Sequence, residues 1–93
     1  MQKEISLEKK LVSICKSKGI HCWKMSSSSI NGIPDRLLVK DTKQVWVELK
    51  TDKGLVSNNQ KEVHKILGNV YLVRNVVEII ELIEKEFIIK LCA

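Results

Sequence analysis

A carboxylate and an amine stand two residues apart in residues 45–50 (VWVELK), an otherwise apolar segment. If this segment is a strand, Glu48 and Lys50 lie on one face, about 6.6 Å apart, because strand side chains alternate between faces. Asp35 lies thirteen positions before Glu48, at the start of another apolar segment. A hairpin turn at 41–43 would set Asp35 opposite residues near Glu48. Two carboxylates would then converge at one end of the hairpin.

Two converging carboxylates are suited to a hard divalent cation such as Mg²⁺, which prefers oxygen ligands and keeps several waters. The carbonyl of Leu49 would add another oxygen, and the ion would stabilise charge on a phosphodiester and help to activate water. Lys50 would orient that water and stabilise the developing charge. The structural alternative is a surface Glu48–Lys50 ion pair, which contributes about 0–1 kcal/mol, with Asp35 as a turn residue after Pro34.

The remaining sequence predicts the elements that would position these side chains. Apolar spacing and capping residues predict helices over 3–18, over 58–67 and from residue 76 onward. Apolar and β-branched segments predict strands at 20–25, 36–40, 44–50 and 70–73. The order α-β-β-β-α-β-α predicts an α/β fold, a mixed sheet flanked by helices, whose last strand is parallel to a neighbour.

Composition narrows the class of protein. The length, 93 residues, suits a single domain over 1–93, and the net charge is +5. Residues 1–50 hold 10 basic and 5 acidic side chains, whereas residues 51–93 hold 6 of each, and such localised positive charge is typical of proteins that bind polyanions. No apolar run approaches the ~18 residues of a membrane helix. The N-terminus is too charged for a secretory signal, so we expect a cytoplasmic protein.

Cysteine and histidine give no sign of a metal clip or a thiol enzyme. The three cysteines have no C-x-x-C spacing. Cys15 continues the apolar stripe of the first helix, which predicts a buried thiol. His21 and His64 lack metal-ligand spacing, so we assign them no role.

Several motifs together resemble a known family. Residues 32–36 (GIPDR) followed by 47–50 (VELK) resemble the PD-(D/E)XK nuclease signature, and the match is best with its VRR-NUC branch. A helix carrying Glu8 and the segment 54–60 (GLVSNNQ) extend the resemblance to about residues 4–83. The resemblance implies a restriction-endonuclease-like core and a Mg²⁺-dependent DNA endonuclease in which Mn²⁺ can substitute.

The resemblance also implies roles for individual residues. Asp35 and Glu48, with the Leu49 carbonyl, would bind the metal, and Lys50 would be the catalytic lysine. Gln60 would complete the site, although a capping box with Ser57 by itself also accounts for this glutamine. On the first helix two glutamates are candidates. Glu8 is the predicted site residue, binding metal through water, and Glu4 is the alternative that would complement the helix dipole.

Polar and basic residues near the Pro-Asp turn are candidates for phosphate contacts. They are Ser27, Ser28, Ser29, Arg36 and Lys24; the serine run is equally consistent with a solvated loop. Short members of the family resemble junction resolvases, which implies a homodimer on branched DNA such as a four-way junction, in a bacterial or phage-infected cytoplasm. The competing interpretation is a non-catalytic DNA-binding module that kept the nuclease fold.

Overall fold

The helices and strands follow one another in the order that the sequence predicts. The computed structural model describes residues 4–26, 30–51 and 54–88. The elements are α1 (Glu4–Ser17), β1 (His21–Lys24), β2 (Arg36–Lys40), β3 (Lys43–Leu49), α2 (Asn58–Leu67), β4 (Val70–Val73), α3 (Val76–Ile83) and the π-helical turn η1 (Glu84–Ile88). In the part of the chain so described, no helix has the length and apolarity needed to cross a membrane.

The four strands form one mixed sheet in the order β1-β2-β3-β4. The first three are antiparallel to their neighbours, and β4 lies parallel to β3 after the crossover through α2. The β2–β3 hairpin turns at Asp41 and Thr42, whose φ angles are 50° and 68°. Two consecutive positive φ angles are typical of the type I′ turn, which matches the twist of the flanking strands and fixes their register.

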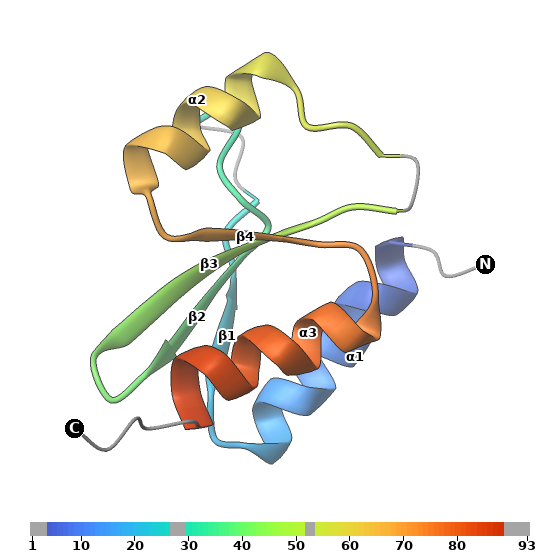
Figure 1. The fold of residues 1–93 in the computed structure, drawn as a ribbon, viewed down its shortest axis with the longest axis vertical. Coiled ribbons are helices and arrows are strands. Elements are labelled where there is room, and N and C mark those ends of the chain that lie inside the picture. The colour runs from blue at the N-terminus through green and yellow to red at the C-terminus, as the bar shows by residue number, and fades with distance from the viewer. Residues whose placement is uncertain (1–3, 27–29, 52–53, 89–93) are drawn as a thin grey trace.

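The hydrophobic core lies on one face of the sheet, under α1 and α3 (Figure 1). On α1, Leu7, Leu11 and Cys15 are at most 1 % exposed, which confirms the predicted apolar stripe and the buried thiol. They pack with Val45 and Val47 of β3 in the same core cluster. Because successive side chains of β3 point to opposite faces, the same strand presents Glu48 to the other side.

Helix α2 covers that other face and buries none of its own residues. Its position is set at its N-terminus, where Ser57 and Gln60 form a complete capping box. Gly32, with φ +96°, packs so closely on this first turn that a Cβ would lie 2.7 Å from the carbonyl oxygen of Asn59. Arg74 holds the preceding loop by donating to the carbonyls of Thr51 (2.6 Å) and Gly54 (2.7 Å).

Candidate active site at the end of the central hairpin

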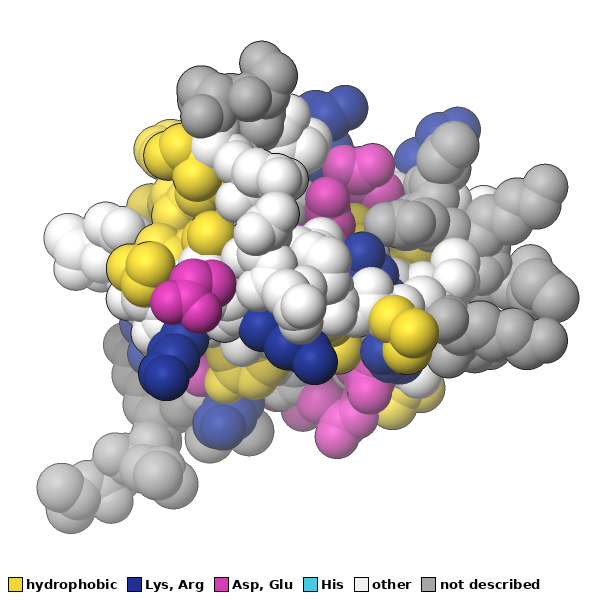
Figure 2. Space-filling view, turned by 90° about the horizontal axis from the view of Figure 1, so that it is seen from above, with side chains coloured by type: hydrophobic (Ala, Val, Ile, Leu, Met, Phe, Trp, Pro, Cys, Tyr) yellow, Lys and Arg dark blue, Asp and Glu magenta, His cyan; other side chains and the backbone are white. Residues whose placement is uncertain are grey.

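The hairpin register brings Asp35 and Glu48 together. Arg36 pairs with Val47, so Asp35, one residue before Arg36, faces Glu48 across the two strands, and residues directly opposite share a face. The Oδ2 atom of Asp35 accepts a hydrogen bond of 2.8 Å from the backbone N–H of Leu49. This bond fixes the Asp35 carboxylate at the end of β3. Figure 2 views this side of the molecule from above α2, with acidic and basic side chains lying beside one another.

Glu48 is a buried carboxylate, only 2 % exposed, and it is contacted from two elements. The Nζ atom of Lys50 lies 3.7 Å from its Oε2. From α2, the Nε2 atom of Gln60 donates to the same oxygen at 3.0 Å. A buried charge is stable only when it is paired and hydrogen-bonded, so these contacts explain how the carboxylate is kept there.

Gln60 makes both the capping contact and a contact with Glu48, because its amide has two ends. Its Oε1 accepts from the backbone N–H of Ser57 at 2.9 Å, which closes the capping box. Its Nε2 points to Glu48. The cap therefore orients the amide so that its donor faces the carboxylate.

His64 is a site neighbour that the sequence did not indicate. It lies one turn after Gln60 on α2, and its Nε2 is 3.8 Å from Oε1 of Glu48. Burial, followed by the positive charge of Lys50, lowers the pKa of His64, although the Asp35 carboxylate acts in the opposite direction. The spacing i, i+4 from Gln60 was the available signal, since such residues share a helix face.

Glu8 of α1 forms an ion pair with Arg36 at the start of β2. Its Oε2 accepts from Arg36 Nε at 2.9 Å, and Arg36 Nη1 donates to the carbonyl of Cys22 at 3.1 Å. Arg36 is thus a link between α1, β1 and β2 with two donors engaged inside the protein. The metal role of Glu8 and the phosphate role of Arg36 stay predictions.

Of the other residues predicted to contact DNA, the structure describes only Lys24. Lys24 is exposed at the end of β1, where a phosphate could reach it. Ser27, Ser28 and Ser29 lie outside the described residues, as does the side chain of Glu4.

The donor set suits a hard cation. Among residues 4–26, 30–51 and 54–88, no three His, Cys, Asp or Glu side chains converge closely enough to hold an ion by themselves. Asp35, Glu48 and the Leu49 carbonyl offer oxygen atoms only. Oxygen ligands supplemented by several waters are the usual environment of Mg²⁺, whereas thiolates and imidazoles select softer ions.

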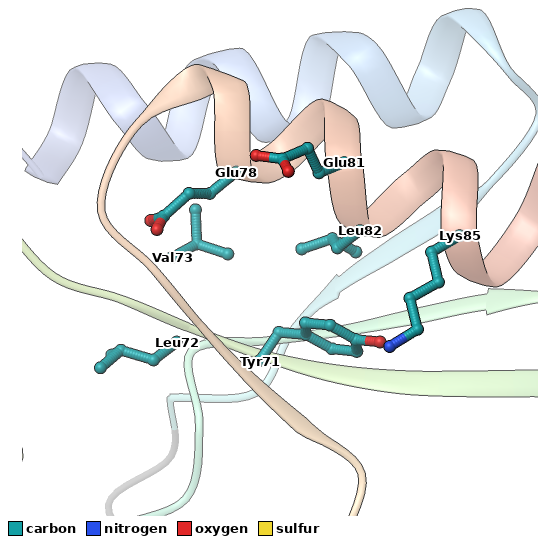
Figure 3. A pocket seen from close by; sticks show the side chains of 7 residues that line it. All are labelled: Tyr71, Leu72, Val73, Glu78, Glu81, Leu82 and Lys85. Carbon is teal, nitrogen blue, oxygen red and sulfur yellow. The ribbon is translucent and has the colours of Figure 1, made fainter.

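A separate hollow of about 290 Å³ lies between β4 and the last helix (Figure 3). Tyr71 and Lys85 point toward each other there, with the Lys85 amine 5.8 Å from the ring centre. The Tyr71 hydroxyl also contacts Glu86, and Glu86 forms an ion pair of 2.8 Å with Lys43. These contacts join β3, β4 and η1 rather than facing Asp35 and Glu48.

The arrangement defines a class: a mixed α/β sheet with two carboxylates and a lysine at the end of its central hairpin. No protein-family model and no curated protein matches the sequence. A solved structure titled "VRR_NUC domain" matches with a TM-score of 0.82 and 22 % sequence identity, over 94 % of this chain and 100 % of that one. The chain therefore has the fold of a VRR_NUC domain, which confirms the predicted fold class.

Proposed function

We propose that this protein is a Mg²⁺-dependent DNA endonuclease that hydrolyses phosphodiester bonds. The observation that carries the proposal is the meeting of Asp35, Glu48 and Lys50 at one end of the hairpin, with Gln60 hydrogen-bonded to the buried carboxylate. The fold shared with a VRR_NUC domain supports it. A protein that only bound DNA would gain nothing from carboxylates beside phosphates, because like charges repel.

In this proposal Asp35, Glu48 and the Leu49 carbonyl would hold Mg²⁺, for which Mn²⁺ would substitute. When bound, the ion would stabilise phosphoryl charge and help to activate a water molecule. Lys50 places its ammonium group next to the Glu48 carboxylate, where it orients the attacking water and stabilises charge in the transition state. A bond would form between the water oxygen and phosphorus while the ester P–O bond breaks. The attacking water would give up one proton to the solvent, and the leaving oxygen would take one up from the solvent.

We further propose branched DNA, such as a four-way junction, as the substrate in replication, recombination or repair. The excess positive charge of residues 1–50 suits contacts with phosphates that do not depend on sequence. We propose that DNA shape is the basis of selection, because contacts with phosphates carry no sequence information directly. Cutting two strands of a junction requires two active sites, which a homodimer would supply. We propose that this dimer acts in a bacterial or phage-infected cytoplasm.

The test is cleavage of branched, flapped and linear DNA with and without Mg²⁺ or Mn²⁺. We expect Asp35→Asn and Lys50→Ala to lower the cleavage rate by at least about 10²-fold while DNA binding is kept. Asp41→Asn is the matched control, because Asp41 is an exposed residue at the turn of the same hairpin. It should cleave like the native protein.

The alternative, a non-catalytic DNA-binding module, makes the opposite prediction. It requires that DNA binding be indifferent to metal and that no substrate in the panel be cut. That result would overturn the nuclease proposal.

A further inference from the structure

The imidazole of His64 is turned into the protein beside the candidate site. Its side chain is 17 % exposed, but its Nε2 atom has no solvent contact and no hydrogen-bond partner among the described residues. Buried polar atoms normally have such a partner, and leaving one without it costs stability. A buried polar atom in this state therefore calls for an explanation.

An acceptor close to that nitrogen is the Glu48 carboxylate. The distance from Nε2 to Glu48 Oε1 is 3.8 Å, which is longer than a hydrogen bond but within reach of a small side-chain shift. On the previous turn of α2, Gln60 already donates to Oε2 of the same carboxylate. Side chains on one face of α2 therefore approach both carboxylate oxygens of Glu48.

We propose that His64 is a positioning residue for Glu48, an inference that rests on the proposed nuclease function. In the loaded site its Nε2–H donates to Oε1 while Gln60 donates to Oε2, so that α2 fixes the orientation of a metal-binding carboxylate from both sides. Because its Nε2 atom is buried, this nitrogen faces Glu48 rather than a DNA strand in solvent. Partners that orient metal ligands in this way change metal affinity or activity by about 10–100-fold when they are lost.

The charges around the imidazole agree with a donor of this kind. A neutral imidazole carries a single N–H. Placing that hydrogen on Nε2 gives the Glu48 carboxylate a donor without adding a second positive charge beside Lys50.

Three variants separate positioning from packing. His64→Leu removes the donor and keeps an apolar side chain, His64→Gln returns an N–H near the place of Nε2, and His64→Asn is too short to return it. The control is His21→Leu, which alters the exposed histidine of β1. The measurements are Mn²⁺ binding by calorimetry, kcat and KM for DNA cleavage, and urea unfolding without metal.

We expect His64→Leu to weaken Mn²⁺ binding and to lower kcat by about 10-fold each, with KM for DNA unchanged. His64→Gln should recover most of both losses, and His64→Asn should not. Native metal affinity and kcat in His64→Leu would overturn the proposal and leave His64 a packing residue. If His64→Leu does not fold, equal behaviour of the Gln and Asn variants would overturn it.

The proposal about His64 and the proposed function fail in different ways. If the native protein binds Mn²⁺ but cuts no DNA, the nuclease assignment fails, and the calorimetry still decides whether His64 supports the metal site. If the native protein cuts DNA and the His64 variants match it throughout, only the positioning role fails. If the native protein neither binds Mn²⁺ nor cuts DNA, both fail.

Discussion

Single side chains at this site serve two neighbours at once. The Gln60 amide closes the α2 cap through its oxygen and holds Glu48 through its nitrogen. The Asp35 carboxylate is fixed by the backbone of Leu49, the same residue whose carbonyl is a proposed metal ligand. Such sharing ties the shape of the site to local backbone geometry, so that the site residues are held in place before any ligand arrives.

The chain's one tyrosine allows a direct test of the contacts between β4 and η1. Burial, with the hydrogen bond to Glu86 and the charge of that carboxylate, raises the pKa of Tyr71 to about 12. Because the folded state keeps this proton to higher pH than the unfolded state, its contribution to stability is present below pH 10 and is lost as the pH rises toward 12.

Tyrosinate absorbance, read directly after a pH jump, should show a midpoint near 12 in the native protein and near the ordinary value of about 10 in denaturant. Glu86→Gln should lower the native midpoint but not to the denatured value, because burial, the largest cause, is retained. A native midpoint equal to the denatured one would contradict the structure at this position.

At the scale of single residues, the sequence predicts the carboxylates and the lysine of the candidate site better than the residues that contact them. Asp35, Glu48 and Lys50 could be found because strand periodicity and a short turn place them together. His64 was harder to find: its spacing from Gln60 placed it on the same helix face, but its approach to Glu48 depends on how α2 docks on the sheet. Glu8 is similar: its helix was predicted, but its pairing with Arg36 depends on packing between elements.

Among the secondary-structure elements, α2 is the one whose docking decides the site. Its first turn rests on the backbone of Gly32, where a Cβ would lie 2.7 Å from the Asn59 carbonyl oxygen. Most elements could be predicted from local sequence patterns alone. Strand β2 has the predicted bounds, and β1 is shorter than its predicted range by one residue at each end. The end of α3 differs, because it continues as a π-helical turn, a form that a simple helical period does not indicate.

Gly32→Ala should therefore push α2 away from the sheet. The matched control is Gly19→Ala, since Gly19 also has positive φ, +69°, but a Cβ there meets nothing within 4 Å. The control should lose about 1–2 kcal/mol of unfolding free energy through backbone strain alone. Gly32→Ala should lose at least about 1 kcal/mol more, measured by urea unfolding, and should also lose cleavage activity. Equal losses in the two variants would show that the close approach does not hold α2.

At the scale of the whole molecule, the two faces of the sheet differ in what they carry. The α2 face carries the candidate site, and the opposite face is closed by α1 and α3. Between α1 and the segment formed by α3 and η1 lies a groove of about 490 Å³, whose lining includes Ile14, Ile83 and two isoleucines that are 43 % (Ile80) and 47 % (Ile88) exposed. A second copy seated there would cover apolar surface and leave the candidate sites of both copies open to solvent.

The proposed homodimer therefore predicts a specific oligomeric state. Sedimentation at micromolar concentration should show a dimer for the native protein and a monomer for Ile80→Glu, because a charge buried at an apolar interface is costly. Ile66→Glu is the control, since Ile66 is 77 % exposed on α2, away from the groove, and this variant should stay dimeric. Ile80→Glu should nick branched DNA on one strand but lose paired cuts on two strands. If the native protein is a monomer at all concentrations, with and without junction DNA, the proposed dimer and the resolvase form of the proposed function are wrong. Metal-dependent cleavage of a single strand at the Asp35–Glu48 site would still be expected.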